Sequence, residues 1–287
     1  MKGSILIFLF AGLAVATARG QVASPAPAPG EPGAEDSTPE AGGEHLRVET
    51  EFGPLHLWRP ANYEPRTAGM VVYVHGYYTS ADQTWADDHL ATQFRDSGRN
   101  ALFLAIEAPP SSNEDVFWKS LEVLLRTVED RIPFPLPRGP LVVVGHSGSY
   151  RTILLWLHDP RVQYVILLDG LYGGLADFRD WLRPRPRSKP HRMVLVSSDT
   201  WRQSSQFARR IYGTARRGSI PAKSSSFTPR ETHAPLLYLR SQYDHAEMIT
   251  SGKVIPVLLQ ITPIKALATV KPQPTEALQP KPTALVR

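Results

Sequence analysis

A short stretch in the middle of the chain constrains the fold most: four apolar residues, Leu141 to Val144, run directly into Gly145-His146-Ser147-Gly148-Ser149. Continuous apolar runs of this length are typical of strands that are buried on both faces. The glycines on either side of Ser147 allow a sharp turn, and the residues after it have helical character. The pattern predicts a buried strand, a tight turn with a serine at its apex, and a helix that begins near Tyr150.

The rest of the central chain alternates strand-like and helix-like segments in the same way. Residues 46–52 and 55–58 flank Gly53-Pro54 and predict an antiparallel hairpin. Apolar runs predict strands at 70–74, 101–106, 162–168, 193–196 and 236–239. Apolar residues at helical spacing predict helices at 81–96, 115–132, 175–182, 202–212 and 253–261. Strands of this kind, alternating with helices, indicate an α/β protein whose mostly parallel sheet is covered by helices on both faces.

The two ends of the chain differ in composition from its centre. Lys2, an apolar segment from Ile5 to Val15 and small residues at 16–18 predict a signal peptide over residues 1–18. Residues 19–44 are rich in Pro, Ala, Gly and Glu and predict a disordered linker, and residues 262–287 predict a disordered Pro/Lys tail. One domain, residues 45–261, remains. We therefore expect an exported protein, periplasmic or extracellular, with no membrane span once the signal peptide is removed.

Composition excludes several other classes of protein. The chain has no cysteine, so disulfides and a lipoprotein anchor are excluded. A formal net charge of +5 is mild, and aromatic residues are not interleaved with basic runs, so we expect no nucleic-acid partner. No His-Glu-x-x-His run occurs, so we expect no metal, and no signature of a cofactor site is found.

Several chemically capable residues fall at the carboxyl ends of predicted strands, where parallel sheets bind ligands. They are His75-Gly76-Tyr77, the Gly145–Ser149 turn, an aspartate after a late strand, and His245 after the last strand. In this arrangement the chain resembles the α/β-hydrolase superfamily, over essentially the whole domain. The resemblance implies the α/β-hydrolase fold with a short cap region, and hydrolysis by an activated serine without a cofactor.

The resemblance also implies a role for individual residues. Ser147 would be the nucleophile, and His245 the general base, because the family's chain order is serine, acid, histidine. The backbone N–H groups of Tyr77 and Gly148 would form the oxyanion hole. Ser149 stands where the family usually has a second glycine, which is a small departure because serine is also a small residue.

Two aspartates are candidates for the acid of the triad. Asp199 follows the strand at 193–196, the commonest position in the superfamily, but it also suits a helix N-cap. Asp169 ends the apolar strand at 162–168 and precedes Gly170, which would place its carboxylate at the sheet edge near the serine. The sequence leaves this choice open. Whichever aspartate is the acid would orient the imidazole and stabilise its cation.

The segment 181–192 is rich in Arg, Lys and Pro and lies between two predicted strands. It could form a basic rim that meets an anionic substrate, or a solvated loop stiffened by proline. Its short length argues against a large lid.

These observations predict an exported serine hydrolase. It would cleave an ester bond, with an amide bond as the alternative, in a small-molecule or envelope-derived acyl substrate, through an acyl-enzyme. The alternative is a non-catalytic exported module that keeps the fold and binds a component of the cell envelope. The sequence gives no indication of oligomeric state.

Overall fold

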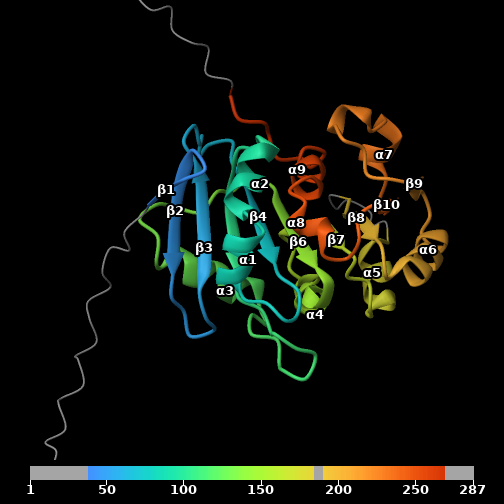
Figure 1. The fold of residues 1–287 in the computed structure, drawn as a ribbon, viewed down its shortest axis with the longest axis horizontal. Coiled ribbons are helices and arrows are strands. Elements are labelled where there is room, and N and C mark those ends of the chain that lie inside the picture. The colour runs from blue at the N-terminus through green and yellow to red at the C-terminus, as the bar shows by residue number, and fades with distance from the viewer. Residues whose placement is uncertain (1–37, 184–189, 269–287) are drawn as a thin grey trace, which may run out of the picture. The chain divides into compact units, whose positions relative to one another are not determined.

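A ten-stranded sheet forms the centre of the molecule (Figure 1). The computed structural model describes residues 38–183 and 190–268, so the predicted signal peptide and most of the predicted linker and tail lie outside the described residues. The strands follow the order β1-β2-β3-β5-β4-β6-β7-β8-β10-β9. Their bounds are β1 (Thr38–Glu40), β2 (Gly43–Val48), β3 (Leu55–Pro60), β4 (Gly69–Val74), β5 (Ala101–Ile106), β6 (Leu141–His146), β7 (Val162–Leu168), β8 (Arg192–Ser197), β9 (Ala215–Arg217) and β10 (Leu236–Arg240).

The pairing of the strands confirms the predicted mixed sheet. Strands β1, β2 and β3 are antiparallel to their neighbours, and β3 is antiparallel to β5. From β5 to β9 every pair is parallel. The chain runs from β4 outward to β5 on one side and then returns to β6 on the other side of β4. Strand order therefore reverses between β4 and β6, and open α/β sheets bind ligands at the carboxyl ends of strands at such a point.

Helices cover both faces of the sheet, as the sequence predicts. They are α1 (Ala81–Asp87), α2 (Leu90–Ser97), α3 (Leu121–Glu129), α4 (Tyr150–Trp156), α5 (Leu175–Trp181), α6 (Trp201–Arg210), α7 (Pro229–His233), α8 (Glu247–Thr250) and α9 (Val254–Leu259), with short 3₁₀ turns at η1 (Ser147–Ser149) and η2 (Ser224–Ser226). Within the described residues, none of these helices combines the length and hydropathy that a membrane crossing requires.

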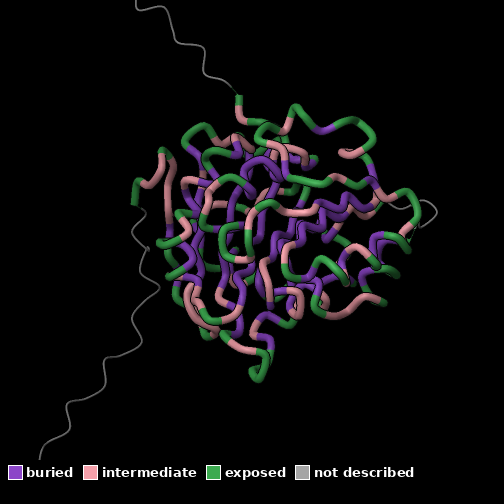
Figure 2. Tube along the Cα trace, turned by 45° about the vertical axis from the view of Figure 1, so that its right-hand side comes forward, coloured by how far each residue is buried: buried purple, intermediate pink, exposed green. Residues whose placement is uncertain are grey.

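Alternating side chains of each central strand enter two separate cores. In β4, Met70, Val72 and Val74 pack with α3, α4, α5 and α6, whereas Val71 and Tyr73 pack with α1, α2, α8 and α9. Side chains alternate in direction along a strand, so a run that is apolar at every position can serve both faces. The central strands are accordingly buried along their length (Figure 2). Each such aliphatic side chain contributes about 1.5–3 kcal/mol to folding.

Described structure continues beyond residues 45–261 at both ends. Strand β1 and the start of β2 occupy residues 38–44, and the indole N–H of Trp58 donates to the Glu40 carbonyl at 2.9 Å. At the other end, Asn100 N–H donates to the Lys265 carbonyl at 2.8 Å, and Ile264 is buried. Short segments can be ordered by pairing with an existing edge even when their composition is poor in apolar residues.

Two predicted helices differ from the observed ones. The predicted helix at 81–96 is divided into α1 and α2 at His89, whose φ of 51° lies in the left-handed region and interrupts the helix. The predicted helix at 115–132 contracts to α3, which begins after the N-cap Ser120. Val116 and Trp118 are nevertheless buried. Their apolar spacing therefore reflects a packed loop.

Candidate active site

The turn after β6 exposes Ser147 at the point where strand order reverses. Ser147 has a φ of 53°, a left-handed conformation that is strained for a residue with a side chain. Helix α4 begins three residues later, so the strand, turn and helix follow the predicted pattern. A Cβ at Gly145 would lie 2.4 Å from both the Ile153 side chain and the Ser149 hydroxyl, so a larger residue there would require these side chains to move. The backbone thus holds the Ser147 hydroxyl above the sheet edge.

His245 bridges Ser147 and Asp169. Its Nε2 lies 3.0 Å from the Ser147 hydroxyl, and its Nδ1 lies 2.8 Å from Oδ2 of Asp169. The loop after β10 supplies His245, and the end of β7 supplies Asp169. Three segments that are far apart in the sequence therefore meet at one edge of the sheet.

Asp169 is a fully buried carboxylate in a dense set of hydrogen bonds. Its Oδ1 accepts from the backbone N–H of Ser198 (2.9 Å) and Thr200 (3.0 Å) and from the Thr200 hydroxyl (2.6 Å). Burial alone would disfavour the charge, but the hydrogen bonds from His245, Thr200 and Ser198 together outweigh it and hold the pKa of Asp169 well below its usual range. Asp169 is therefore ionised at neutral pH.

Asp199, the other predicted acid, lies beside this group but does not hydrogen-bond to the imidazole. Its backbone N–H donates to Asp169 Oδ2 at 3.0 Å, and its own side chain is exposed. One potential metal-ligand atom from each of Asp169, Asp199 and His245 lies within 4.8 Å of the other two, which is close enough for all three to bind one cation. Both oxygens of Asp169 already accept hydrogen bonds from the protein, however, so the arrangement suits a fixed carboxylate better than a metal ligand.

The environment of His245 favours its protonated form. The hydrogen bond with Asp169 is the main cause that raises the pKa of His245, and burial opposes it. His146, immediately before Ser147, holds the same loop from the other side, since its Nε2 lies 3.0 Å from the His245 carbonyl. Burial lowers the pKa of His146 to about 4, so His146 stays neutral and its Nε2–H can donate to that carbonyl.

The turn after β4 brings Tyr77 against Gly148. A Cβ on Gly148 would lie 2.5 Å from the Tyr77 ring, and a Cβ on Gly76 would lie 2.8 Å from the Ser147 Cβ. Within the described part of the chain, the Tyr77 N–H has no hydrogen-bond acceptor. The two glycines therefore allow the loop to approach the serine closely.

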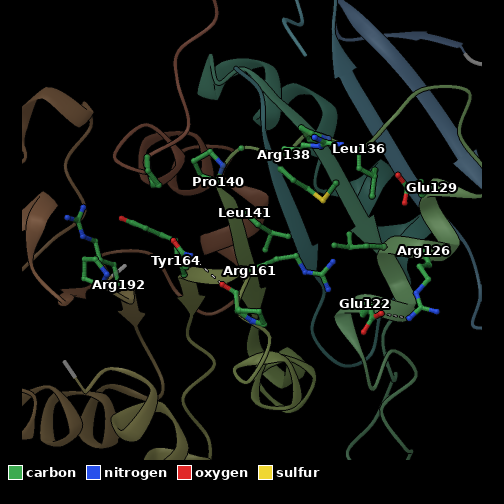
Figure 3. Close-up of a pocket in the computed structure, with 18 residues that line it drawn as sticks. Glu122, Arg126, Glu129, Leu136, Arg138, Pro140, Leu141, Arg161, Tyr164 and Arg192 are labelled. Carbon is green, nitrogen blue, oxygen red and sulfur yellow. Dashed lines mark hydrogen bonds and ion pairs between the residues drawn. The ribbon is translucent and has the colours of Figure 1, made fainter. Parts of the chain in front are cut away.

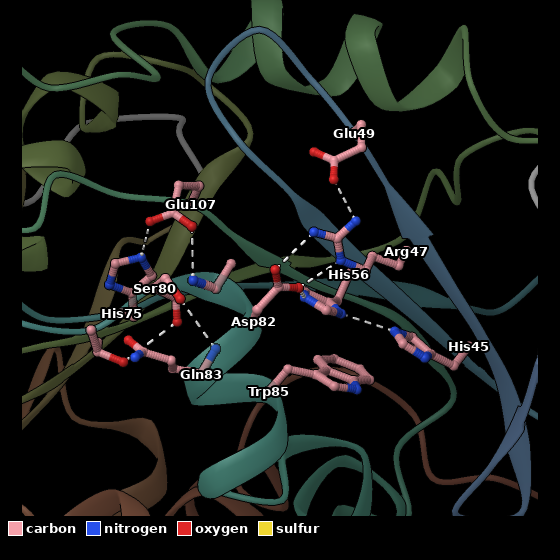
Figure 4. A network of polar contacts seen from close by, with 12 residues as sticks. His45, Arg47, Glu49, His56, His75, Ser80, Asp82, Gln83, Trp85 and Glu107 are labelled. Atoms are coloured by element: carbon pink, nitrogen blue, oxygen red, sulfur yellow. Dashed lines mark hydrogen bonds and ion pairs between the residues drawn. The ribbon is translucent and has the colours of Figure 1, made fainter.

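A buried polar contact fixes this turn (Figure 4). His75 Nδ1 lies 2.6 Å from the Gly76 carbonyl, and its Nε2 lies 3.0 Å from Glu107, which follows β5. The second oxygen of Glu107 accepts from the Ala81 N–H at 2.9 Å, at the start of α1. The loop that carries Tyr77 is thus anchored to both a neighbouring strand and a helix.

Ser147 and His245 line a cavity of about 700 Å³. Its wall includes Tyr77, Gly148 and Asp199, so all the predicted site residues line it except the buried Asp169. A larger cavity of about 840 Å³ is lined by none of the predicted catalytic or oxyanion-hole residues (Figure 3). It lies where β4, β6 and β8 begin, at the edge of the sheet opposite to Ser147.

The flanks of the basic segment 181–192 also lie at that opposite edge. Residues 184–189 are outside the described residues, but Pro190 and Arg192 line the larger cavity, and Arg192 is the first residue of β8. These flanking residues therefore do not support a basic rim over the cavity at Ser147.

Three residues contact the predicted site residues although the sequence pattern does not predict these contacts. Thr200 bonds to Asp169, His146 bonds to the His245 carbonyl, and the Tyr172 ring lies 6.5 Å from the His245 ring. Burial, with the charges of Asp169 and Asp199, raises the pKa of Tyr172 to about 12, so its hydroxyl is neutral. Position at a strand end is the signal these residues share, because each lies within four residues of β6, β7 or β8.

Comparisons with known proteins support the fold. No protein-family model matches the sequence, and no curated protein matches it. Among solved structures, the feruloyl esterase module from Clostridium thermocellum has a TM-score of 0.52 and 10% identity, over 78% of this chain and 93% of that chain. A ferulic acid esterase from Anaeromyces mucronatus has a TM-score of 0.50 and 13% identity, over 80% of this chain and 92% of that chain. At this level of identity the likeness concerns architecture, and it establishes that the chain has the α/β-hydrolase fold.

Proposed function

We propose that this chain is a serine hydrolase that cleaves carboxylic ester bonds, with amide bonds as the alternative, through Ser147, His245 and Asp169. One observation carries the proposal: the His245 ring lies 3.0 Å from the Ser147 hydroxyl on one side and 2.8 Å from the Asp169 carboxylate on the other. A serine hydroxyl needs an adjacent base to become nucleophilic, and that base needs a partner that fixes its tautomer.

The geometry supports a two-step reaction. His245 Nε2 takes the proton as the Ser147 oxygen attacks the acyl carbon, and the tetrahedral intermediate then expels the alcohol, which receives that proton. Water attacks the acyl-enzyme in the second step, gives its proton to His245, and releases the acid and free Ser147. Asp169 remains ionised throughout and stabilises the imidazolium.

The oxyanion of the intermediate would be held by the backbone N–H groups of Tyr77 and Gly148. Three observations support this assignment: both residues line the cavity at Ser147, the Tyr77 N–H has no acceptor within the described residues, and the turn is anchored by His75 and Glu107. Removing one donor of this kind typically raises the barrier by about 3 kcal/mol.

The substrate would be a small-molecule or envelope-derived acyl ester. The two similar structures described above are named as a feruloyl esterase and a ferulic acid esterase, and ester hydrolysis is the reaction the site supports best. We also propose export, on the strength of the sequence at residues 1–18. N-terminal sequencing of protein secreted by an expressing bacterium should then begin at Arg19, and retention of Met1 in the secreted form would contradict this.

Hydrolysis of p-nitrophenyl acetate tests the mechanism. Ser147→Ala, His245→Ala and the double variant should each lose most of kcat, and the double variant should be little worse than either single one, because the residues act as a unit. Wild-type protein that is folded but gives no turnover and no covalent labelling would instead favour the non-catalytic binding module.

A further inference from the structure

The cavity at Ser147 has a charge opposite to that of the chain. The full sequence carries a net +5, yet no Lys or Arg is among the described residues that line this cavity. The charged side chains of its wall are the carboxylates of Asp88 and Asp199, and His146 and His245 are also present. Any charged part of a substrate that enters this space therefore meets negative groups.

Neither carboxylate of this wall has a side-chain partner among the described residues, and Asp88 is the half-buried one, whereas Asp199 is exposed. The backbone of Asp88 is fixed, because its N–H donates to the Thr84 carbonyl at 3.2 Å and its carbonyl accepts from the Gln93 side chain at 2.7 Å. Its side chain, by contrast, makes no hydrogen bond or ion pair with another described residue. A nearby carboxylate, Asp82, is paired with Arg47. A half-buried carboxylate that the protein leaves unpaired is incompletely solvated, so it would gain from pairing with a cationic group of a ligand.

The surroundings of Asp88 are consistent with this position. Burial and the neighbouring Asp87 raise the pKa of Asp88 to about 6, while His89 and His75 act in the opposite direction. Burial raises the pKa of Tyr73, and the negative charge of Asp88 raises it further. Tyr73 lines the same cavity. At neutral pH the carboxylate is therefore mostly ionised but incompletely solvated, which is the state that a cation would stabilise.

Aromatic rings provide the second element of a cation site. Tyr77, Tyr78, Tyr150 and Tyr172 line the cavity, and Tyr78 is 90% exposed with a left-handed φ of 64°. The rings form two contacting pairs, Tyr77–Tyr78 at 6.4 Å and Tyr150–Tyr172 at 6.2 Å. Tyrosine faces attract ammonium groups, most strongly where water is partly excluded.

The guanidinium group beside the Tyr77 ring already has partners. Arg151 contacts the Tyr77 hydroxyl at 3.3 Å and donates to the carbonyls of Ser111, Ser112 and Glu114. Arg151 does not line the cavity, and it forms no ion pair with Asp88.

We propose that this cavity selects esters that carry a cationic ammonium group, with Asp88 as the counter-ion and the tyrosines that line the same cavity as its aromatic wall. The inference rests on the proposed serine hydrolase and adds the charge of its substrate. Asp88 is a specificity-determining residue in this proposal and takes no part in bond breaking.

A pair of nearly isosteric esters tests the proposal. Acetylcholine and 3,3-dimethylbutyl acetate differ in having a quaternary nitrogen or a quaternary carbon. Wild-type protein should hydrolyse acetylcholine with the higher kcat/KM, by about tenfold. Asp88→Asn should abolish most of this ratio, and because the ratio compares two substrates within one variant, a general loss of activity cancels. Asp87→Asn removes the same charge one residue away, outside the cavity wall, and should keep the wild-type ratio.

A binding measurement separates this proposal from the catalytic one. Isothermal titration calorimetry with tetramethylammonium and Ser147→Ala protein measures cation binding in the absence of ester hydrolysis. Binding that weakens about tenfold on adding Asp88→Asn, but not Asp87→Asn, supports the proposal even if no ester is turned over. Absence of binding, or equal ester ratios in wild type and Asp88→Asn, would overturn it while leaving ester hydrolysis intact.

Discussion

Two aspartates follow neighbouring strands, and their side chains meet different surroundings. Asp169 is fully buried and bonds to the His245 ring, whereas Asp199 is exposed and contributes its backbone N–H to Asp169. We expect Asp169→Asn to lower kcat by about 10⁴-fold, because the amide cannot hold the required tautomer of His245. Asp199→Asn keeps its backbone N–H and should lower kcat by less than tenfold. A larger loss in Asp199→Asn would contradict the assignment.

The same pair of variants predicts a change in pH dependence. His245 must be neutral to act as a base, and the Asp169 hydrogen bond raises the pKa of His245 above its usual value of 6.5. Activity should therefore rise with pH through a pKa above 6.5, and Asp169→Asn should move this limb to lower pH. Profiles of kcat/KM for p-nitrophenyl acetate measure the shift, and Asp199→Asn should move the limb less, because Asp199 raises the pKa of His245 through its charge alone and less than Asp169 does. If the rise of kcat/KM with pH occurred at the same pH in Asp169→Asn as in wild type, a group other than His245 would be responsible for it.

At the residue scale, the sequence predicts the turn at Ser147 and the loop at His245, and the structure brings them within 3.0 Å although 98 positions separate them. The sequence alone cannot select between Asp169 and Asp199. That choice depends on where the amides of residues 198–200 point, and these are set by the path of the loop after β8. Ser149, the one departure from the family pattern, has a buried hydroxyl without a partner among the described residues.

At the scale of elements, the segment after α9 completes the domain although its composition resembles a tail. Ile264 is 1% exposed, and the Leu267 N–H donates to the Gly98 carbonyl at 2.9 Å. We predict that Ile264→Ala lowers the free energy of unfolding by about 2–4 kcal/mol, through lost burial and the cavity left behind. Lys265→Ala, at an exposed neighbour, should change it by less than about 0.5 kcal/mol. Urea denaturation measures both, and equal values would mean that the segment does not pack.

Strands are predicted better than helices for a physical reason. The runs at 101–106 and 162–168 match β5 and β7, because a strand buried on both faces must be apolar at every position. Helix ends depend on single caps and on left-handed residues such as His89, which the spacing of apolar residues does not report. The sequence pattern does not predict strand β9 or helix α7, because both are short and polar. Pairing with β10 stabilises β9, and the capping box at Thr228 stabilises α7.

At the scale of the whole molecule, buried histidines couple folding to pH. His56 is 3% exposed, bonds to His45 and Asp82, and stacks on Trp85 (Figure 4). Burial, followed by the proximity of His45, lowers the pKa of His56 to about 4. Between pH 6.5 and 4 the unfolded chain takes up this proton and the folded one does not, so stability falls as the pH falls.

This argument predicts a difference between wild type and His56→Gln. From pH 7 to pH 4, wild type should lose up to about 3 kcal/mol more stability than the variant, because glutamine does not titrate. His245 and Asp88 have raised pKa values, so their protonation stabilises the folded protein as the pH falls. Wild type and His56→Gln share this effect, and it cancels when the two proteins are compared. Urea denaturation at several pH values measures the difference. Parallel pH profiles would show that His56 is protonated in the folded protein.

The central claim is that Ser147 is a nucleophile activated by His245, and covalent labelling tests it most directly. A fluorophosphonate should add once to the wild-type chain, and peptide mapping by mass spectrometry should place the adduct on Ser147. Ser147→Ala should take no label, and His245→Ala should label far more slowly while remaining folded by circular dichroism. An adduct on another residue, or none on folded wild-type protein, would contradict the account.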